Sequence, residues 1–418
     1  MACGVPVALA LGAGAAVFFL GSDGLPAEAF VQKVQSSFGS FPLLAIPLFV
    51  LAASILNAAG VTQRLFALAE ILVGRSTGGL GKINVLMATL MGGISASASA
   101  DAAMQAKLIG VPMIERGYPR PFVAAIIACS AVITPIIPPG IGFILYGAMT
   151  ETSIGRLFTA GILPGLLLCL ALIVIVHVEA TRLERSGGVA PLRAPRRTPG
   201  AVLRALRRAS LALLMPLFII VGIRFGLFTA TEAGAVMVVI GLAFGFLIYR
   251  ELSWPALARS IGETVEATAS LMLIVCFSTA FAFYLTWEGI PQATARFIVA
   301  QSTDPIVIII LINVALLVAG MFLDMVSAMI ILVPIIHPIA LRVGIDPVHM
   351  GLMVVLNLTM GAVTPPVGTL MYLVNGVLGT SVVAFTRAAA PFFLGMLVVL
   401  ALVAFVPALS LLLPNVLF

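Results

Sequence analysis

Charged residues are scarce in this chain of 418 residues: 9% are Asp, Glu, Lys or Arg, whereas 61% are hydrophobic. So few charges cannot cover the surface of a water-soluble globule of this length, which excludes a soluble fold. The mean hydropathy of +1.21 is that of a polytopic membrane protein. The sequence therefore predicts an all-α membrane protein, because helices satisfy their own backbone polar groups within lipid.

Residues for metal, redox and nucleotide chemistry are also few. The four cysteines are Cys3, Cys129, Cys169 and Cys276. Each lies alone in or beside an apolar segment, which is typical of small hydrophobic residues rather than of disulfides. His177, His337 and His349 show no metal-ligand spacing, so we expect packing or interfacial roles. No Gly-x-x-x-x-Gly-Lys-Ser/Thr run is present, and neither ATP hydrolysis nor an enzyme activity is predicted.

Apolar stretches are plentiful, and most approach the roughly 20 helical residues that cross a bilayer core. They lie at about 4–20, 41–60, 122–149, 158–178, 211–228, 232–249, 264–285, 348–376 and 390–413. No basic stretch precedes the first of them, which predicts a short first helix rather than a signal peptide. Shorter apolar limbs at about 83–94, 100–112, 306–322 and 327–341 flank small or polar residues, which favours re-entrant hairpins over full crossings.

Two apolar stretches are interrupted by segments that cannot be α-helical, TPIIPPG at 134–140 and GAVTPPVG at 361–368. Their Pro-Pro pairs stand 227 residues apart, at 139 and 366. At the same spacing Gly93 matches Gly320, Gly117 matches Gly344, and Pro164 matches Pro391. Because Gly and Pro set backbone geometry, we interpret the chain as two copies of one unit.

The distribution of basic residues predicts an orientation. Eight arginines crowd the polar segment 179–210, and an excess of Lys and Arg marks cytoplasmic loops. An Arg-rich run can also bind nucleic acid, but this one has no interleaved aromatic residues, so contact with anionic lipid headgroups is favoured. The first hairpin is bordered by Arg64, Arg75, Lys82, Lys107, Arg116 and Arg120, and the second only by Arg296 and Arg342. The two hairpins are therefore predicted to open to opposite sides, which makes the units inverted.

The two breaks predict a site for ions and anions. Irregular backbone persists at membrane depth only inside protein or facing a wet cavity, because lipid offers its polar groups no partners. Each break should present carbonyl oxygens that suit Na⁺ and helix N-termini that suit a carboxylate. The hydroxyls of Thr134 and Thr364 could join such a cation site. The alternative is that each Pro-Pro pair only kinks a packed helix.

Polar side chains mark the predicted hairpin tips. The tract GGISASASAD at 92–101 carries three serines and ends in Asp101, and Asp324 closely follows Gly320 in the second hairpin. An acid at membrane depth is costly and normally faces a cavity or a partner. Two alternatives stay open: the serines pack helices closely as small residues do, and the acids accept hydrogen bonds from backbone amides at the tips.

Six segments carry a family resemblance. They are FPLLAIPLF at 41–49, the serine-rich tract ending at Asp101, IIPP at 136–139, FTATEA at 228–233, GIDPVH at 344–349 and TPPVG at 364–368. In this order they resemble the large membrane subunit of tripartite ATP-independent periplasmic (TRAP) transporters, from about residue 41 to the C-terminus. Ala96 stands where the family usually has Gly, and Gly140 where Ser often follows Pro-Pro.

The resemblance implies a Na⁺-coupled secondary transporter of the elevator type, in which a transport domain holding both hairpins and both breaks moves. Its substrates would be small organic acids such as C4-dicarboxylates, keto acids or sialic acid. It implies a periplasmic substrate-binding protein, a small membrane subunit, surrounding membrane lipids and the bacterial inner membrane. Na⁺ would be co-transported, and no organic cofactor is implied.

The resemblance also implies which residues bind. One ion-binding half would comprise 95–101 with 134–140, the other 320–324 with 361–366, and substrate would lie between them. The expected Na⁺ ligands are Gly93, Ser97, Thr134, Gly320, Asp324, Gly361, Thr364 and Pro366. The expected substrate contacts are Ser95, Ser97, Ser99, Asp101, Pro138, Pro139, Pro365 and Pro366. Glu232 lies outside these halves and is expected to serve the scaffold.

The predicted organisation has four parts. They are an N-terminal helix and lead-in (1–40), a first inverted repeat (41–178; hairpin about 83–112, broken helix 122–149), a connecting region with the basic loop (179–263) and a second inverted repeat (264–418; hairpin about 306–341, broken helix 348–376). A stand-alone Na⁺/dicarboxylate symporter is the closest alternative, and it would not depend on a binding protein. A channel or a membrane-embedded enzyme is a more distant one, since an enzyme would gather its polar groups near one interface.

Overall fold

The computed structural model describes residues 7–21, 28–95, 97–185, 198–301 and 304–418, which are mostly helical and contain no strand. The helices of the first half are α1 (Val7–Gly21), α2 (Glu28–Ser36), α3 (Ala45–Ala58), α4 (Val61–Val73), α5 (Gly79–Gly92), α6 (Ala98–Gln105), α7 (Val111–Glu115), α8 (Arg120–Ser130), α9 (Ile141–Thr150) and α10 (Ile154–Arg185). Three short elements accompany them, the 3₁₀ turns η1 (Ser37–Gly39) and η2 (Phe41–Leu44) and the π-helical turn η3 (Ala106–Gly110).

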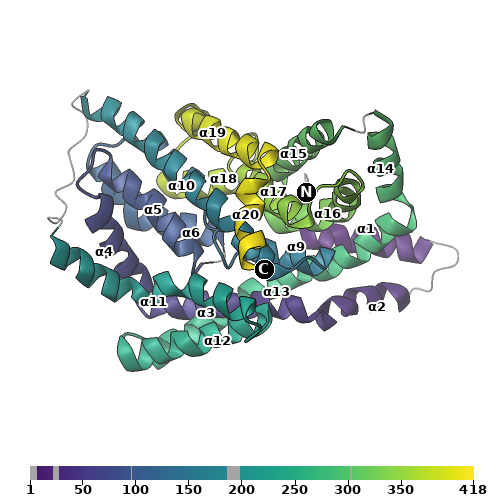
Figure 1. The fold of residues 1–418 in the computed structure, drawn as a ribbon, viewed down its shortest axis with the longest axis horizontal. Coiled ribbons are helices and arrows are strands. Elements are labelled where there is room, and N and C mark those ends of the chain that lie inside the picture. The colour runs from purple at the N-terminus through teal and green to yellow at the C-terminus, as the bar shows by residue number, and fades with distance from the viewer. Residues whose placement is uncertain (1–6, 22–27, 96, 186–197, 302–303) are drawn as a thin grey trace.

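The remaining helices follow the basic segment. They are α11 (Pro199–Arg224), α12 (Ala230–Ala243), α13 (Trp254–Trp287), α14 (Ile290–Gln301), α15 (Pro305–Phe322), α16 (Met325–Arg342), α17 (Pro347–Gly361), α18 (Thr369–Leu378), α19 (Val382–Phe405) and α20 (Ala408–Leu417). The π-helical turn η4 (Phe244–Ile248) continues α12. In Figure 1, α3, α11, α12 and α13 run along one long edge of the molecule, and α9, α17 and α18 lie inside it.

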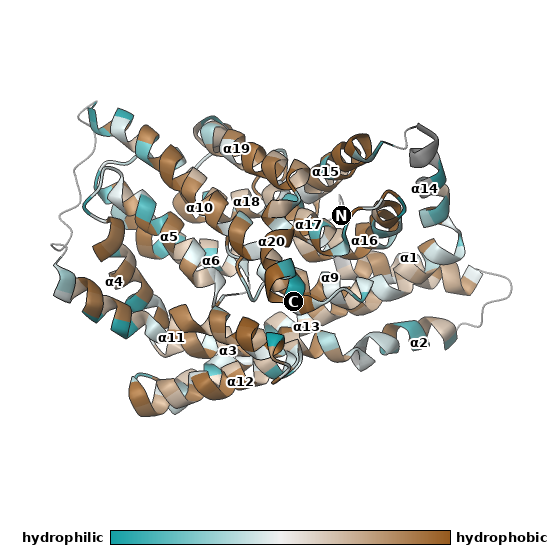
Figure 2. Ribbon diagram, in the orientation of Figure 1, coloured by the Kyte–Doolittle hydropathy of each residue, from teal (hydrophilic) through white to brown (hydrophobic). Residues whose placement is uncertain are grey.

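Eight helical segments of the described chain are long and apolar enough to cross a membrane. They are Phe41–Ala58, Ile154–Arg185, Pro199–Arg224, Ala230–Ile248, Trp254–Trp287, Pro305–Phe322, Met325–Arg342 and Val382–Phe405. Figure 2 shows hydrophobic residues over most of these helices, as a lipid environment requires. The prediction of an all-α, multi-pass membrane protein is confirmed.

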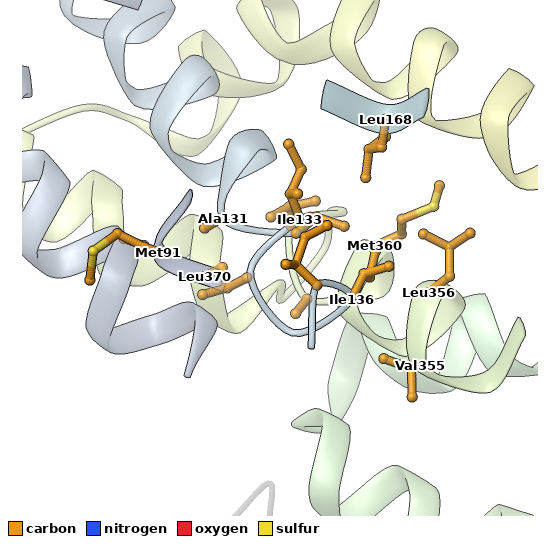
Figure 3. Packing of buried hydrophobic residues seen from close by; sticks show 14 of the residues in the cluster. Met91, Ala131, Ile133, Ile136, Leu168, Val355, Leu356, Met360 and Leu370 are labelled. Atoms are coloured by element: carbon orange, nitrogen blue, oxygen red, sulfur yellow. The ribbon is translucent and has the colours of Figure 1, made fainter. Parts of the chain in front are cut away.

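Both predicted helix breaks are present. The first separates α8, which ends at Ser130, from α9, and the second separates α17, which ends at Gly361, from α18. Each break contains a cis Pro-Pro peptide bond. Figure 3 shows Ile133 and Ile136 of the first break among apolar side chains of neighbouring helices, and both are fully buried. The first break is therefore part of the hydrophobic core.

Helices of the two halves begin at matching positions. The starts of α6 and α16 (98 and 325) and those of α8 and α17 (120 and 347) are both 227 residues apart. Gly117 and Gly344, at the same spacing, both have positive φ, which favours Gly. Each half packs against the other, since α6 of the first half contacts α18 of the second, and α16 of the second contacts α9 of the first. The inverted orientation and the predicted domain limits stay predictions.

Several predicted bounds differ from the structure. The segment 179–210 is not a continuous loop, because α10 extends to Arg185 and α11 begins at Pro199. Thr198 starts α11 by accepting a hydrogen bond from the Ala201 amide, and Pro199 suits the first helical position. Three of the segment's arginines, Arg193, Arg196 and Arg197, lie outside the described residues.

Other bounds differ because hydropathy locates apolar centres rather than helix ends. The stretch 390–413 is two helices, since α19 ends at Phe405 and Pro407, which has no N–H to continue a helix, precedes α20. The limbs expected at 306–322 and 327–341 are 18-residue helices that are long enough to cross a membrane. The amphipathic helices α4 and α14 were not among the predicted segments.

Candidate functional site

Asp101 in α6 joins the first hairpin to the first break. Its carboxylate is 2% exposed, and its Oδ2 accepts hydrogen bonds from Thr134 Oγ1 at 2.8 Å and from Gln105 Nε2 at 2.6 Å. The Thr134 hydroxyl lies in the break and is also 3.3 Å from the carbonyl oxygen of Ala88 in α5. Both limbs of the hairpin and the break therefore meet at one buried hydroxyl.

Oxygen atoms without hydrogen-bond donors occur at this junction and along the first break. Asp101 Oδ1 is buried and has no partner within the described chain. The carbonyl oxygens of residues 134–139 accept no hydrogen bond from any described residue either. Unpaired buried oxygens are costly, whereas unwound carbonyls and a carboxylate suit Na⁺. The first half thus contains oxygen atoms of the kind that coordinate Na⁺.

The second hairpin and the second break meet through their backbones. A Cβ on Gly361 would lie 2.5 Å from the Cα of Gly320, so both positions require glycine for this approach. The Gly368 amide donates to the Met321 carbonyl oxygen at 2.9 Å. Among described residues, no donor reaches the carbonyl oxygens of 363–367. Gly320 and Gly361, both expected Na⁺ ligands, thus serve here as the contact between the two segments.

The two hairpin tips share an N-cap position. Asp324 caps α16 by accepting from the amides of Val326 at 3.0 Å and Ser327 at 3.2 Å, and the Ser327 hydroxyl donates to its other oxygen. Ser97, 227 residues earlier, caps α6 by accepting from the Ala100 amide at 3.3 Å. In the structure Asp324 therefore accepts hydrogen bonds from backbone amides at the hairpin tip, as the alternative prediction for this acid proposed.

The second break is less covered than the first. Pro138 and Pro139 are buried, whereas Pro365 is half-buried and Pro366 is exposed. The Thr364 hydroxyl donates to the Met360 carbonyl oxygen at 2.8 Å, which leaves its own lone pairs available. A ligand from outside the chain can therefore reach the second break more directly than the first.

A cavity of about 240 Å³ opens beside the first hairpin tip. Ser95, Ser97 and Asp101 line it from the hairpin, and Asn57 of α3 and Glu263 of α13 line it from the opposite side. Ser99 is exposed next to it, 3.2 Å from Ser97 between the hydroxyl oxygens. None of the four Pro-Pro residues lines this cavity. The structure thus gathers the expected serines and Asp101, but not the prolines.

Glu263 was not among the predicted site residues. Its Oε2 lies 3.3 Å from the Ser54 hydroxyl, and it lies on α13, which starts at Trp254. The predicted span began at 264, so this acid was assigned to a connector. The signal was its position directly before the predicted span 264–285, which itself contains Glu266.

Glycine at position 140 has a geometric cause. A Cβ there would lie 2.1 Å from the Pro135 carbonyl oxygen, which no side chain tolerates. In the backbone conformation of this break, position 140 therefore requires glycine. Gly93 packs away from the break, because a Cβ there would lie 2.5 Å from Pro216 of α11. Ala96, the other departure, lies outside the described residues.

Several remaining polar residues have structural roles. Glu232 and Thr229 form a capping box at the start of α12, with the Thr229 amide 2.7 Å from Glu232 Oε2. Glu232 therefore stabilises the start of α12, and its expected place in the scaffold stays a prediction. Each histidine contacts a neighbouring side chain, His177 with Lys82, His337 with Tyr146 and His349 with Ser410. Across the described chain no three His, Cys, Asp or Glu side chains form a metal-binding group.

Comparison with known proteins identifies the family. The family described as "Tripartite ATP-independent periplasmic transporter, DctM component" matches residues 1–409. The chain belongs to the DctM family. The family predicted from the six segments is therefore confirmed, and this DctM chain is a transporter subunit rather than an enzyme.

Relatives of this DctM chain are similar over most of their length. The sialic acid TRAP transporter large permease protein SiaM of Vibrio cholerae is 37% identical over 412 residues, which are 99% of this chain and 95% of the relative. The C4-dicarboxylate TRAP transporter large permease protein DctM of Pseudomonas aeruginosa is 36% identical over 375 residues, which are 90% of this chain and 86% of the relative. The crystal structure of the Alcanivorax borkumensis YdaH transporter superposes with a TM-score of 0.62 at 14% identity, covering 97% and 98% of the two chains, and so shows a shared fold.

Proposed function

We propose that this DctM chain is the permease through which a TRAP transporter imports a small organic acid together with Na⁺. The relatives named above are named for sialic acid and for C4-dicarboxylates, and both kinds of compound carry carboxylates. This supports a carboxylate substrate, whose identity we leave to experiment.

The junction of Asp101 and Thr134 is the observation that carries the proposal. A cation at this junction would satisfy Asp101 Oδ1, which is buried and has no donor in the described chain. It would also balance a carboxylate charge that is buried beside a cavity. The same ion would hold the hairpin against the break, because Asp101 and Thr134 belong to different segments.

The proposed cycle starts with Na⁺. Na⁺ binds the carbonyl oxygens of the breaks with Thr134 and Thr364, orders both hairpin tips and offsets the negative charge of the arriving substrate. The substrate then binds between the halves, beside Ser95, Ser97 and Asp101. The hairpins and the broken helices pack on one another, α5 on α8 and α15 on α17, which suits their movement as one loaded domain. Movement of that domain past the scaffold completes an elevator-type step.

The proposed surroundings follow the family. A small membrane subunit lies beside this chain in the bacterial inner membrane, and a periplasmic substrate-binding protein delivers the acid. The basic segment 179–210 faces the cytoplasm, as its arginines predict.

The test is uptake of radiolabelled organic acids into proteoliposomes that contain this chain and its small subunit. Each acid is offered with and without an inward Na⁺ gradient and with and without the binding protein. Uptake only when both are present supports the proposal and names the substrate. Na⁺-driven uptake without the binding protein indicates the stand-alone symporter, and uptake that ignores Na⁺ contradicts the coupling.

A further inference from the structure

A second cavity, of about 710 Å³, lies between α4, α11 and the segment 249–251. Arg64, Arg204, Arg208, Tyr249 and Glu251 line it. It shares no lining residue with the cavity at the hairpin tip. Three guanidinium groups and one carboxylate give this basic cavity a net positive charge.

Arg64 forms a fixed wall of the basic cavity. Its two terminal nitrogens donate to Glu251 at 3.1 and 2.7 Å, and one of them also donates to the Gly60 carbonyl oxygen at 2.7 Å. The guanidinium lies 3.7 Å from the centre of the Tyr249 ring. Arg64 and Glu251 therefore neutralise each other, and the surplus charge belongs to α11.

Arg204 and Arg208 stand one turn apart on α11 and carry that surplus. Arg204 Nε donates to the Gly200 carbonyl oxygen at 3.2 Å, and no carboxylate of the described chain pairs with either guanidinium. Like charges at this spacing repel, so an anion between them would stabilise the helix. The Tyr249 hydroxyl, which donates to the Arg208 carbonyl oxygen at 3.3 Å, closes the cavity on the other side.

Apolar side chains border the basic cavity. Ala67 and Ile71 of α4 line it, and Leu247 and Ile248 are exposed directly before Tyr249. The apolar helix α11 has 26 residues, more than the roughly 20 that cross the hydrocarbon core, so its first turns reach the headgroup region. A ligand with an anionic head and apolar chains would match both the arginines and this border.

We propose that the basic cavity binds the phosphate group of an anionic phospholipid, with Arg204 and Arg208 as its ligands. Guanidinium groups bind phosphate oxygens through paired, charge-assisted hydrogen bonds, and basic pockets between membrane helices accept anionic headgroups. A free phosphate compound shares this chemistry and is separated from a lipid by the experiment below. The site is independent of the transport proposal, because it involves none of the transport residues.

The test is native mass spectrometry of the delipidated full chain in detergent. Dioleoyl phosphatidylglycerol, dioleoyl phosphatidylcholine and glycerol 3-phosphate are titrated separately. The matched variants are the double substitution Arg204→Gln with Arg208→Gln and the control Arg207→Gln, which removes a charge from the same helix outside the cavity. We expect phosphatidylglycerol to bind the wild type and the control alike, and the double variant about tenfold more weakly or worse, since each Arg contributes severalfold.

The variant Glu251→Gln tests the opposite change, a gain in lipid binding. Among the described residues that line the basic cavity it removes the only carboxylate, so phosphatidylglycerol should bind this variant more tightly than the wild type. Equal binding by the double variant and the Arg207→Gln control would overturn the site, as would equal binding of phosphatidylcholine and phosphatidylglycerol. Arg-dependent binding of glycerol 3-phosphate at the strength of the lipid would keep the phosphate site and assign it to a free phosphate compound. Size-exclusion profiles confirm that each variant is folded.

Discussion

The hydroxyl of Thr134 donates a hydrogen bond of 2.8 Å to the carboxylate of Asp101, although α7 and α8 separate the two residues along the sequence. The bond holds a hairpin tip against a helix break at a point where Asp101 Oδ1 has no donor in the described chain. The first hairpin and the first break are thus joined at one buried carboxylate.

Thr134→Val should weaken Na⁺ binding. Valine keeps the shape of threonine but removes the hydroxyl, and a buried hydrogen bond to a charged group contributes about 1.5–3 kcal/mol. We expect the half-saturating Na⁺ concentration for uptake to rise about tenfold or more, and Thr134→Ser to stay near the wild type. Thr159→Val is the control, because that buried hydroxyl bonds only carbonyls of its own helix. A wild-type Na⁺ titration for Thr134→Val would contradict the assignment of the first ion site.

Substitutions at Asp324 separate capping from ion binding. Asparagine can still cap α16 but carries no charge, whereas alanine removes the cap, which costs about 1 kcal/mol. We expect Asp324→Asn to keep normal abundance with reduced Na⁺ affinity, and Asp324→Ala to lose more Na⁺ affinity than abundance. Abundance is measured by quantitative blotting and affinity by Na⁺ titration of uptake. Unchanged Na⁺ dependence in both Asp324→Ala and Thr364→Ala would remove the ion site from the second half.

Gly361→Ala should destabilise the protein. The added methyl group would lie 2.5 Å from the Gly320 backbone, and overpacking typically costs about 1–3 kcal/mol. Gly376→Ala, in α18, is the matched control, because a Cβ there meets nothing within 4 Å. The control should unfold at or slightly above the wild-type temperature, since alanine favours helix. Thermal unfolding in detergent measures both, and equal midpoints for the two variants would show that the glycine contact is unimportant.

The ion pair of Arg64 and Glu251 predicts a pH dependence. Hydrogen bonding to Arg64 lowers the pKa of Glu251 from its ordinary value of 4.5, so the carboxylate binds its proton less readily in the folded protein. The stability from this pair is fully present above about pH 4.5 and is lost as the pH falls through the lowered pKa. Glu251→Gln should flatten this acid limb of a thermal stability profile, and Glu115→Gln, which removes an exposed acid without a described partner, should leave it unchanged. Because Glu251 is exposed, we expect a small effect.

The helix breaks could be predicted because Pro and Gly dictate backbone geometry locally, whatever surrounds them. Asp101 could be selected from the sequence because an acid at membrane depth is costly, and Thr134 because it lies in a helix break. Their hydrogen bond could not be predicted, because it depends on how α5, α6 and α8 pack. Glu263 escaped prediction because hydropathy finds the apolar centre of α13 and not its polar first turns. The capping role of Asp324 and the backbone contact of Gly320 with Gly361 depend on local geometry, which residue types suggest but do not determine.

The packing of α6 against α18 bears on how the chain is made. A ribosome that has just completed α10 has produced the whole first hairpin, yet the helix that covers one face of it begins only at Thr369. That face of the first hairpin therefore stays uncovered until α18 has been made. Two separately produced fragments, divided between α10 and α11, would each lack a surface that the other supplies, and only their association would complete both halves.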